Sequence, residues 1–120
     1  MLPAAHRLTD PAAFSETVRT GVRAGSRALV VHLLAEAGSE RPVRVGLVVS
    51  KAVGGAVVRT RVKRRLRHQM APLLTMLPAG STVVLRAQPA AATATSAELA
   101  EELRVGLTRC LERTREMTTR

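Results

Sequence analysis

The chain has 120 residues, a formal net charge of +10 and a hydrophobic fraction of 46%, which is enough apolar sequence for one domain with a modest core. Aromatic residues supply only 1%, so valine, leucine and alanine must fill that core, and modules that stack bases on aromatic sheets are disfavoured. No apolar run approaches the 18 residues of a membrane span, and the first ten residues lack the apolar segment of a signal peptide.

The first predicted helix ends at Gly21 and is capped by Thr9 or Asp10, after a flexible arm over residues 1–8. This helix carries Phe14, the only aromatic residue of the protein. Its ring is interpreted either as a core side chain or as an exposed face on which a base can stack.

The strand predictions follow from alternating apolar residues and from turn signals. They cover a short edge strand at 22–26 and longer strands at 27–35, 43–50 and 81–87. Within the third of these, Gly46 indicates that another part of the molecule approaches the backbone closely. Strands and helices in this order predict an α+β sandwich, with helices packed against a small, mostly antiparallel sheet.

A basic helix is predicted over residues 56–71, because no helix breaker occurs there before Pro72. Its apolar stripe comprises Val58, Val62, Leu66 and Met70. Like charges four residues apart, as in Arg61–Arg65 and Lys63–Arg67, destabilise a helix by roughly 0.2–0.5 kcal/mol per pair. Since no acidic residue lies between Glu40 and Glu98, we interpret the basic side as a polyanion-binding face rather than an ordinary solvated face.

The last predicted helix begins with Ser96 as its cap and continues with a leucine stripe. That stripe comprises Leu99, Leu103, Leu107 and Leu111. Residues 114–120 are expected to fray, and we predict a single RNA-binding domain over residues 1–120. The single cysteine, Cys110, excludes an intramolecular disulfide and fits a reducing compartment such as the cytoplasm.

Residues that could form a protein active site are scarce. Asp10 is the only aspartate, and His6, His32 and His68 lie on separate predicted elements, so neither a carboxylate-held metal pair nor a zinc site is expected. His32 is interpreted as a strand residue with satisfied hydrogen bonds rather than as a ligand. The chain is therefore predicted to bind phosphate without breaking bonds itself, and to organise hydrated Mg²⁺ that is held mainly by the bound phosphates.

The run RVGLVVSKAVGGAVVRTRVKRRLRH, residues 44–68, resembles the signature of the bacterial ribonuclease P protein subunit. In that family a Val-Gly strand leads through Ser-Lys and a glycine turn into an arginine-bearing helix. The matching positions are Arg44-Val45-Gly46, Ser50-Lys51, Gly54, Arg59-Thr60-Arg61, Lys63-Arg64 and Arg67. Outside the signature, Arg7-Leu8, Phe14, Gly21 and the strand ending at Pro89 extend the resemblance over residues 6–110.

The resemblance implies a mixed sheet with a left-handed βαβ crossover, like the second domain of ribosomal protein S5. It implies two partners, the ribonuclease P RNA and precursor tRNA, and no required protein partner. The holoenzyme is then an endonuclease that removes the 5′ leader of precursor tRNA by hydrolysis, with the RNA as catalyst. Carried over to this sequence, the residues facing the catalytic RNA are Arg59, Arg61, Lys63, Arg64, Arg65 and Arg67. The implied leader-binding cleft comprises Phe14, Val18, His32, Lys51 and Ala52.

Several positions depart from the family pattern. Thr60 replaces an asparagine between the two signature arginines, and Val18 and His32 replace aromatic residues, so weaker leader stacking is expected. Gly55 replaces a frequent asparagine and Ala52 a usual second lysine. Two other interpretations stay open, namely a ribosomal-type structural RNA-binding protein and a basic helix on a membrane surface.

Overall fold

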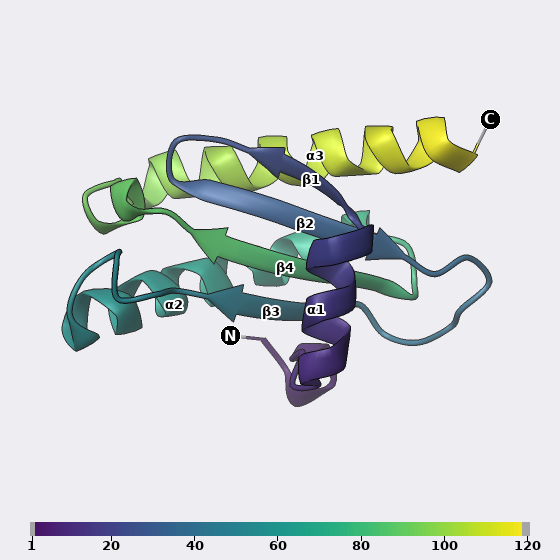
Figure 1. Ribbon diagram of the computed structural model, residues 1–120, viewed down its shortest axis with the longest axis horizontal. Helices are drawn as coiled ribbons and strands as arrows, with labels where there is room; N and C mark the ends of the chain where they lie inside the picture. The colour runs from purple at the N-terminus through teal and green to yellow at the C-terminus, as the bar shows by residue number, and fades with distance from the viewer. Residues whose placement is uncertain (1, 119–120) are drawn as a thin grey trace.

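The computed structural model describes residues 2–118 and confirms the predicted α+β sandwich (Figure 1). The helices are α1 (Pro11–Thr20), α2 (Ala56–Met70) and α3 (Ser96–Thr118), and the strands are β1 (Val22–Gly25), β2 (Leu29–Ala35), β3 (Arg44–Val48) and β4 (Ser81–Ala87). Three short 3-10 helices are η1 (Ala4–His6), η2 (Ala71–Met76) and η3 (Pro89–Ala92). The second and third strands are shorter than predicted, because residues 27–28, 43 and 49–50 lie outside them.

The strands form one mixed sheet in the order β1-β2-β4-β3. The β1–β2 and β2–β4 pairs are antiparallel, whereas β3 and β4 are parallel and are joined through α2. That connection is left-handed (Figure 1), as the resemblance implied. Because nearly all such crossovers are right-handed, this topology is a distinctive feature of the fold.

The helices cover the two faces of the sheet unequally. Figure 1 shows α1 crossing the front of the sheet near the start of β3 and β4, with α3 behind the sheet. Buried residues of α2 and α3 share one core cluster with Val31 of β2 and Leu85 of β4. A large part of the front face is therefore left without a covering helix.

The helix caps agree in part with the prediction. Asp10 caps α1, since its side chain accepts a hydrogen bond from the Ala12 N–H. The prediction that Ser96 caps α3 was wrong, because Thr95 and Glu98 form a reciprocal capping box there. The backbone hydrogen bond from Thr95 is the main cause that lowers the pKa of Glu98.

The N-terminal segment packs against the fold, and the C-terminal segment is helical. Within residues 2–8, expected to form a flexible arm, Leu2 and Leu8 are buried, and the Leu8 N–H donates to the Val45 carbonyl. His6 Nδ1 lies 2.7 Å from the Val43 carbonyl oxygen. At the other end α3 continues through Thr118, and the rest of the predicted frayed tail, residues 119–120, lies outside the described residues.

Candidate nucleic-acid interface

The basic helix α2 is anchored by one apolar side. Val62, Leu66 and Met70 are fully buried, as the predicted stripe requires. The six predicted RNA-facing side chains surround this buried side. Arg61, Arg64 and Arg67 are exposed, and Arg59, Lys63 and Arg65 are half-buried.

In the described part of the chain, no carboxylate forms an ion pair with these side chains. Within residues 2–118, Arg41 forms an ion pair with Glu36 and Arg104 forms one with Glu101, and neither pair involves α2. Since α2 also contains no acidic residue, its positive charge is available to an external polyanion.

One flank of α2 is attached to the segment before α3. The guanidinium of Arg61 donates to the Ala92 carbonyl at 2.9 Å, and that of Arg65 donates to the Ala94 carbonyl at 3.3 Å. One turn further, Gln69 donates to the Ser96 carbonyl at 2.9 Å. These neutral acceptors leave both arginines charged but fix where their charges lie. These hydrogen bonds could not be predicted from the sequence, because their acceptors are backbone carbonyls, which every residue has.

The other flank of α2 faces the N-terminal segment. Lys63 and Arg67 line a hollow of about 200 Å³ together with Arg7, Phe14 and Leu47. No acidic residue is among the lining side chains. This hollow connects the basic helix with the edge of the sheet at β3.

Helix α1 is seated on the sheet through Phe14. A Cβ built on Gly46 would lie 2.3 Å from Phe14 Cζ, so the ring occupies the space above the glycine, as the mid-strand Gly46 indicated. Phe14 is half-buried, and it therefore combines the two interpretations by packing on the sheet while keeping part of its ring exposed.

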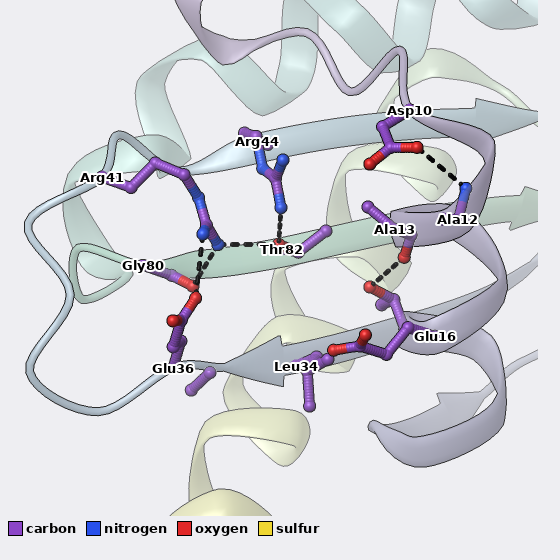
Figure 2. Close-up of a pocket in the computed structure, with 12 residues that line it drawn as sticks. Asp10, Ala12, Ala13, Glu16, Leu34, Glu36, Arg41, Arg44, Gly80 and Thr82 are labelled. Atoms are coloured by element: carbon purple, nitrogen blue, oxygen red, sulfur yellow. Dashed lines mark hydrogen bonds and ion pairs between the residues drawn. The ribbon is translucent and has the colours of Figure 1, made fainter.

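Figure 2 shows the residues that line a cavity on one side of α1. The cavity has a volume of about 430 Å³ and is lined by side chains of both signs of charge. Arg41 and Arg44 point to the Thr82 hydroxyl, at 3.5 and 3.2 Å. The cavity is also lined by three carboxylates, those of Asp10, Glu16 and Glu36. With more carboxylates than guanidinium groups, this side of α1 is a poor surface for a polyanion.

The opposite side of α1 has a different character. The sheet register places Gly25, Val30, Arg86 and Val48 in one row across the four strands, next to the row Arg23, His32, Val84 and Gly46. These positions include two arginines and no acidic residue. Of these residues His32, Val84 and Val30 are buried, whereas Arg23, Gly25 and Arg86 are exposed and Val48 is half-buried. The exposed part of this face, called the open floor beside α1, is therefore the side suited to a nucleic-acid strand.

The predicted leader-binding residues are distributed around this floor. Val18 is 42% exposed and lies one helical turn after Phe14, while Lys51 and Ala52 are exposed in the turn that follows β3. His32 is only 1% exposed, and neither of its ring nitrogens has a hydrogen-bond partner, contrary to the expected satisfied histidine. Burial first, then the charges of Arg86 and Arg23, lower its pKa. Neither arginine was predicted as a site residue.

Two further structural features concern metals and membranes. Within residues 2–118, no group of three or more His, Cys, Asp or Glu side chains is arranged to hold a metal ion. Among the same residues, no helix combines the length and apolar character that crossing a bilayer requires.

Comparison with known proteins decides the family. A model described as Ribonuclease P matches residues 2–111 of this chain. The chain belongs to the ribonuclease P protein family.

Relatives from several bacteria agree with this assignment. The ribonuclease P protein component of a Nocardioides species is 54% identical over 114 residues, which cover 94% of each chain. The Rhodococcus jostii component is 53% identical, with 91% of each chain covered.

Solved structures of the family share the fold. The Staphylococcus aureus RNase P protein superposes with a TM-score of 0.77 at 25% identity, covering 87% of this chain and 94% of that chain. The Thermotoga maritima RNase P protein, 21% identical, superposes with a TM-score of 0.68 and covers 81% of this chain and 90% of that chain.

Proposed function

We propose that this chain binds a ribonuclease P RNA and the 5′ leader of precursor tRNA, and so assists Mg²⁺-dependent endonucleolytic maturation of tRNA. The observation that carries the proposal is the basic side of α2, where six Lys or Arg side chains have no carboxylate partner among residues 2–118. Such a surface binds a polyanion and releases its counterions, so binding should be steeply salt-dependent.

The catalytic RNA is assigned to α2. Arg64 and Arg67 project into solvent, and Arg61 and Arg65 present charges fixed by the 92–94 carbonyls. The fixed guanidinium groups of Arg61 and Arg65 lose little side-chain entropy when they bind RNA phosphates, whereas Arg64 and Arg67 are free to adjust to neighbouring phosphates.

The leader is assigned to the floor beside α1. Its single strand would pass the exposed part of Phe14 and Val18 and the cations Lys51 and Arg86. The carboxylates on the other side of α1 would repel the same strand. Contacts of this kind are largely independent of sequence, which fits a protein that serves many precursor tRNAs.

The chemistry is assigned to the RNA. Mg²⁺ prefers carboxylate, carbonyl and water oxygens, whereas the side chains of α2 include no carboxylate and offer only two neutral oxygen atoms, the Thr60 hydroxyl and the Gln69 amide oxygen. The residues of α2 therefore do not fit a protein-held Mg²⁺ site, and the ion is assigned to RNA phosphates. Location in the cytoplasm and independence from other proteins belong to the same proposal.

The deciding experiment mixes the protein with a ribonuclease P RNA and precursor tRNA at low Mg²⁺. We expect faster leader removal than with RNA alone, and no cleavage by the protein alone. Changing Arg64 and Arg67 to Ala should abolish the stimulation. A matched control changes Arg109 and Arg115 to Ala, since these are exposed arginines on α3.

Cleavage no better than with RNA alone would reject the proposal. The ribosomal-type alternative, a structural RNA-binding protein without a role in cleavage, would then account for the basic helix. RNA-free cleavage would instead reveal a protein active site.

A further inference from the structure

We propose that Arg23 and Arg86 together bind one phosphate of the RNA strand that lies beside α1, above the buried ring of His32. The inference rests on the proposed function, because it adds a residue-level contact to the leader groove. It assigns binding roles to two arginines that lie outside the basic helix and outside the family signature.

The sheet register brings the two arginines to one place. Arg23 of β1 lies directly opposite His32 of β2, and His32 lies opposite Val84 of β4, two residues before Arg86. All three side chains belong to the same face, because residues two apart on a strand point to the same side. With strands about 4.8 Å apart, the Cα atoms of Arg23 and Arg86 are about 12 Å apart, so two long side chains can converge on one anion between them.

The groups at this place lack partners within the protein. Among residues 2–118, neither guanidinium has an ion-pair or hydrogen-bond partner. The His32 ring, although only 1% exposed, makes no hydrogen bond through either nitrogen. More than nine in ten buried polar groups are normally paired, so the unpaired ring of His32 is unusual. The two exposed guanidinium groups on the same face are available to bind an external anion.

The electrostatics of His32 agree with this geometry. Burial is the main cause that lowers the pKa of His32, and the charges of Arg86 and Arg23 lower it further, so both cations lie close enough to act on the same ring. A phosphate bound between them would offset both charges. It would therefore raise the pKa of His32 and leave a signal of binding in the titration of the ring.

A phosphodiester fits the surroundings better than other anions. The floor next to Arg86 is apolar, with Val30 and Val48 as its register neighbours, which suits the sugar and base on either side of a phosphate. Guanidinium groups bind phosphate with two parallel hydrogen bonds. Lys51 is exposed in the turn three residues after Val48, the register neighbour of Arg86, so an RNA strand bound at this site would continue past this turn toward α2.

The test uses the reconstituted holoenzyme and compares precursor tRNA with mature tRNA. We expect Arg23→Ala and Arg86→Ala each to weaken precursor binding by about tenfold, with mature tRNA binding unchanged. The matched control is Arg27→Ala, which removes an exposed arginine that lines a hollow with Glu98 and Glu102 of α3. This control should leave both affinities unchanged.

A second measurement identifies the phosphate. Neutral methylphosphonate linkages are placed one at a time along the leader. At one position, the neutral linkage should weaken precursor binding to the wild-type holoenzyme by about tenfold. The same linkage should not weaken binding to the Arg23→Ala/Arg86→Ala double variant any further. In the absence of the ribonuclease P RNA, adding a short single-stranded RNA to the protein should raise the pKa of His32. Nuclear magnetic resonance measures this pKa.

The outcomes separate this inference from the proposed function. If the holoenzyme cleaves normally and prefers precursor over mature tRNA, but the two variants keep that preference, the phosphate site is wrong and the proposed function stands. Equal losses for precursor and mature tRNA, or equal methylphosphonate effects in wild type and double variant, would also overturn the site. Loss of protein stimulation altogether would reject the proposed function.

Discussion

Phe14 of α1 lies directly above Gly46 of β3, so closely that a Cβ on the glycine would be 2.3 Å from Phe14 Cζ and 2.5 Å from Cε1. This contact determines where α1 crosses the sheet. It therefore also determines the width of the open floor beside the helix. A residue of the family signature thus acts here through packing rather than through contact with RNA.

Gly46→Ala is expected to displace the Phe14 ring and to lower the free energy of unfolding by about 1–3 kcal/mol, the usual cost of overpacking. Urea unfolding measures the change. The control is Gly25→Ala on the same face, where the nearest atom to the new Cβ is Val30 Cγ2 at 4.0 Å. Equal stability of the two variants would show that α1 is not seated through this contact.

The pH dependence of stability should report on His32. Because burial and two arginines lower its pKa in the folded state, the unfolded chain binds more protons just below its own pKa of about 6.5. Stability should therefore be fully present above about pH 6.5 and decrease as the pH falls through the folded pKa, with a slope of at most about 1.4 kcal/mol per pH unit. Unfolding free energies of wild type and His32→Phe, compared between pH 5 and 8, should differ in this slope, and parallel curves would contradict the assignment.

Much of the scaffold could be predicted from the sequence, because it depends on periodicity. The α2 stripe of Val62, Leu66 and Met70 is buried as its spacing required, and Gly46 correctly indicated a close approach. Both features are local patterns whose structural consequence follows from helix and strand geometry.

The candidate site could be predicted only in part. It depends on the pairing register of the strands and on hydrogen bonds to backbone carbonyls, which no sequence pattern gives. Arg23 and Arg86 are 63 residues apart in the chain, and only the strand pairing places them around His32. Likewise, no sequence pattern indicates that Arg61 and Arg65 donate to carbonyls of the 92–94 segment. Charge identified the basic helix, whereas tertiary structure distinguishes its fixed arginines from its free ones.

Cys110 should be unreactive in the folded protein. The residue is fully buried and its thiol lies 3.5 Å from the Val31 carbonyl oxygen, and burial raises its pKa to about 11. At pH 8 the thiol is therefore protonated and inaccessible, and iodoacetamide should label it only when α3 separates from the sheet. Labelling in urea, followed by mass spectrometry, should rise together with global unfolding. Rapid labelling in native buffer would mean that α3 opens independently of the rest of the fold.

Arg64 and Arg65 are adjacent in sequence, but their substitution should have different consequences. Arg64 is exposed and makes no hydrogen bond within residues 2–118, whereas Arg65 is half-buried and holds the Ala94 carbonyl. Arg64→Ala should leave the thermal midpoint unchanged and reduce the slope of log K against log salt for RNA binding by about 0.7–0.9, the contribution of one phosphate contact. Arg65→Ala should in addition lower the free energy of unfolding by about 0.5–1.5 kcal/mol through the lost hydrogen bond. Calorimetry and RNA titrations from 50 to 300 mM salt, on the order of the range that changes such affinities strongly, distinguish the two variants. An unchanged salt slope for Arg64→Ala would remove this side chain from the RNA-binding surface.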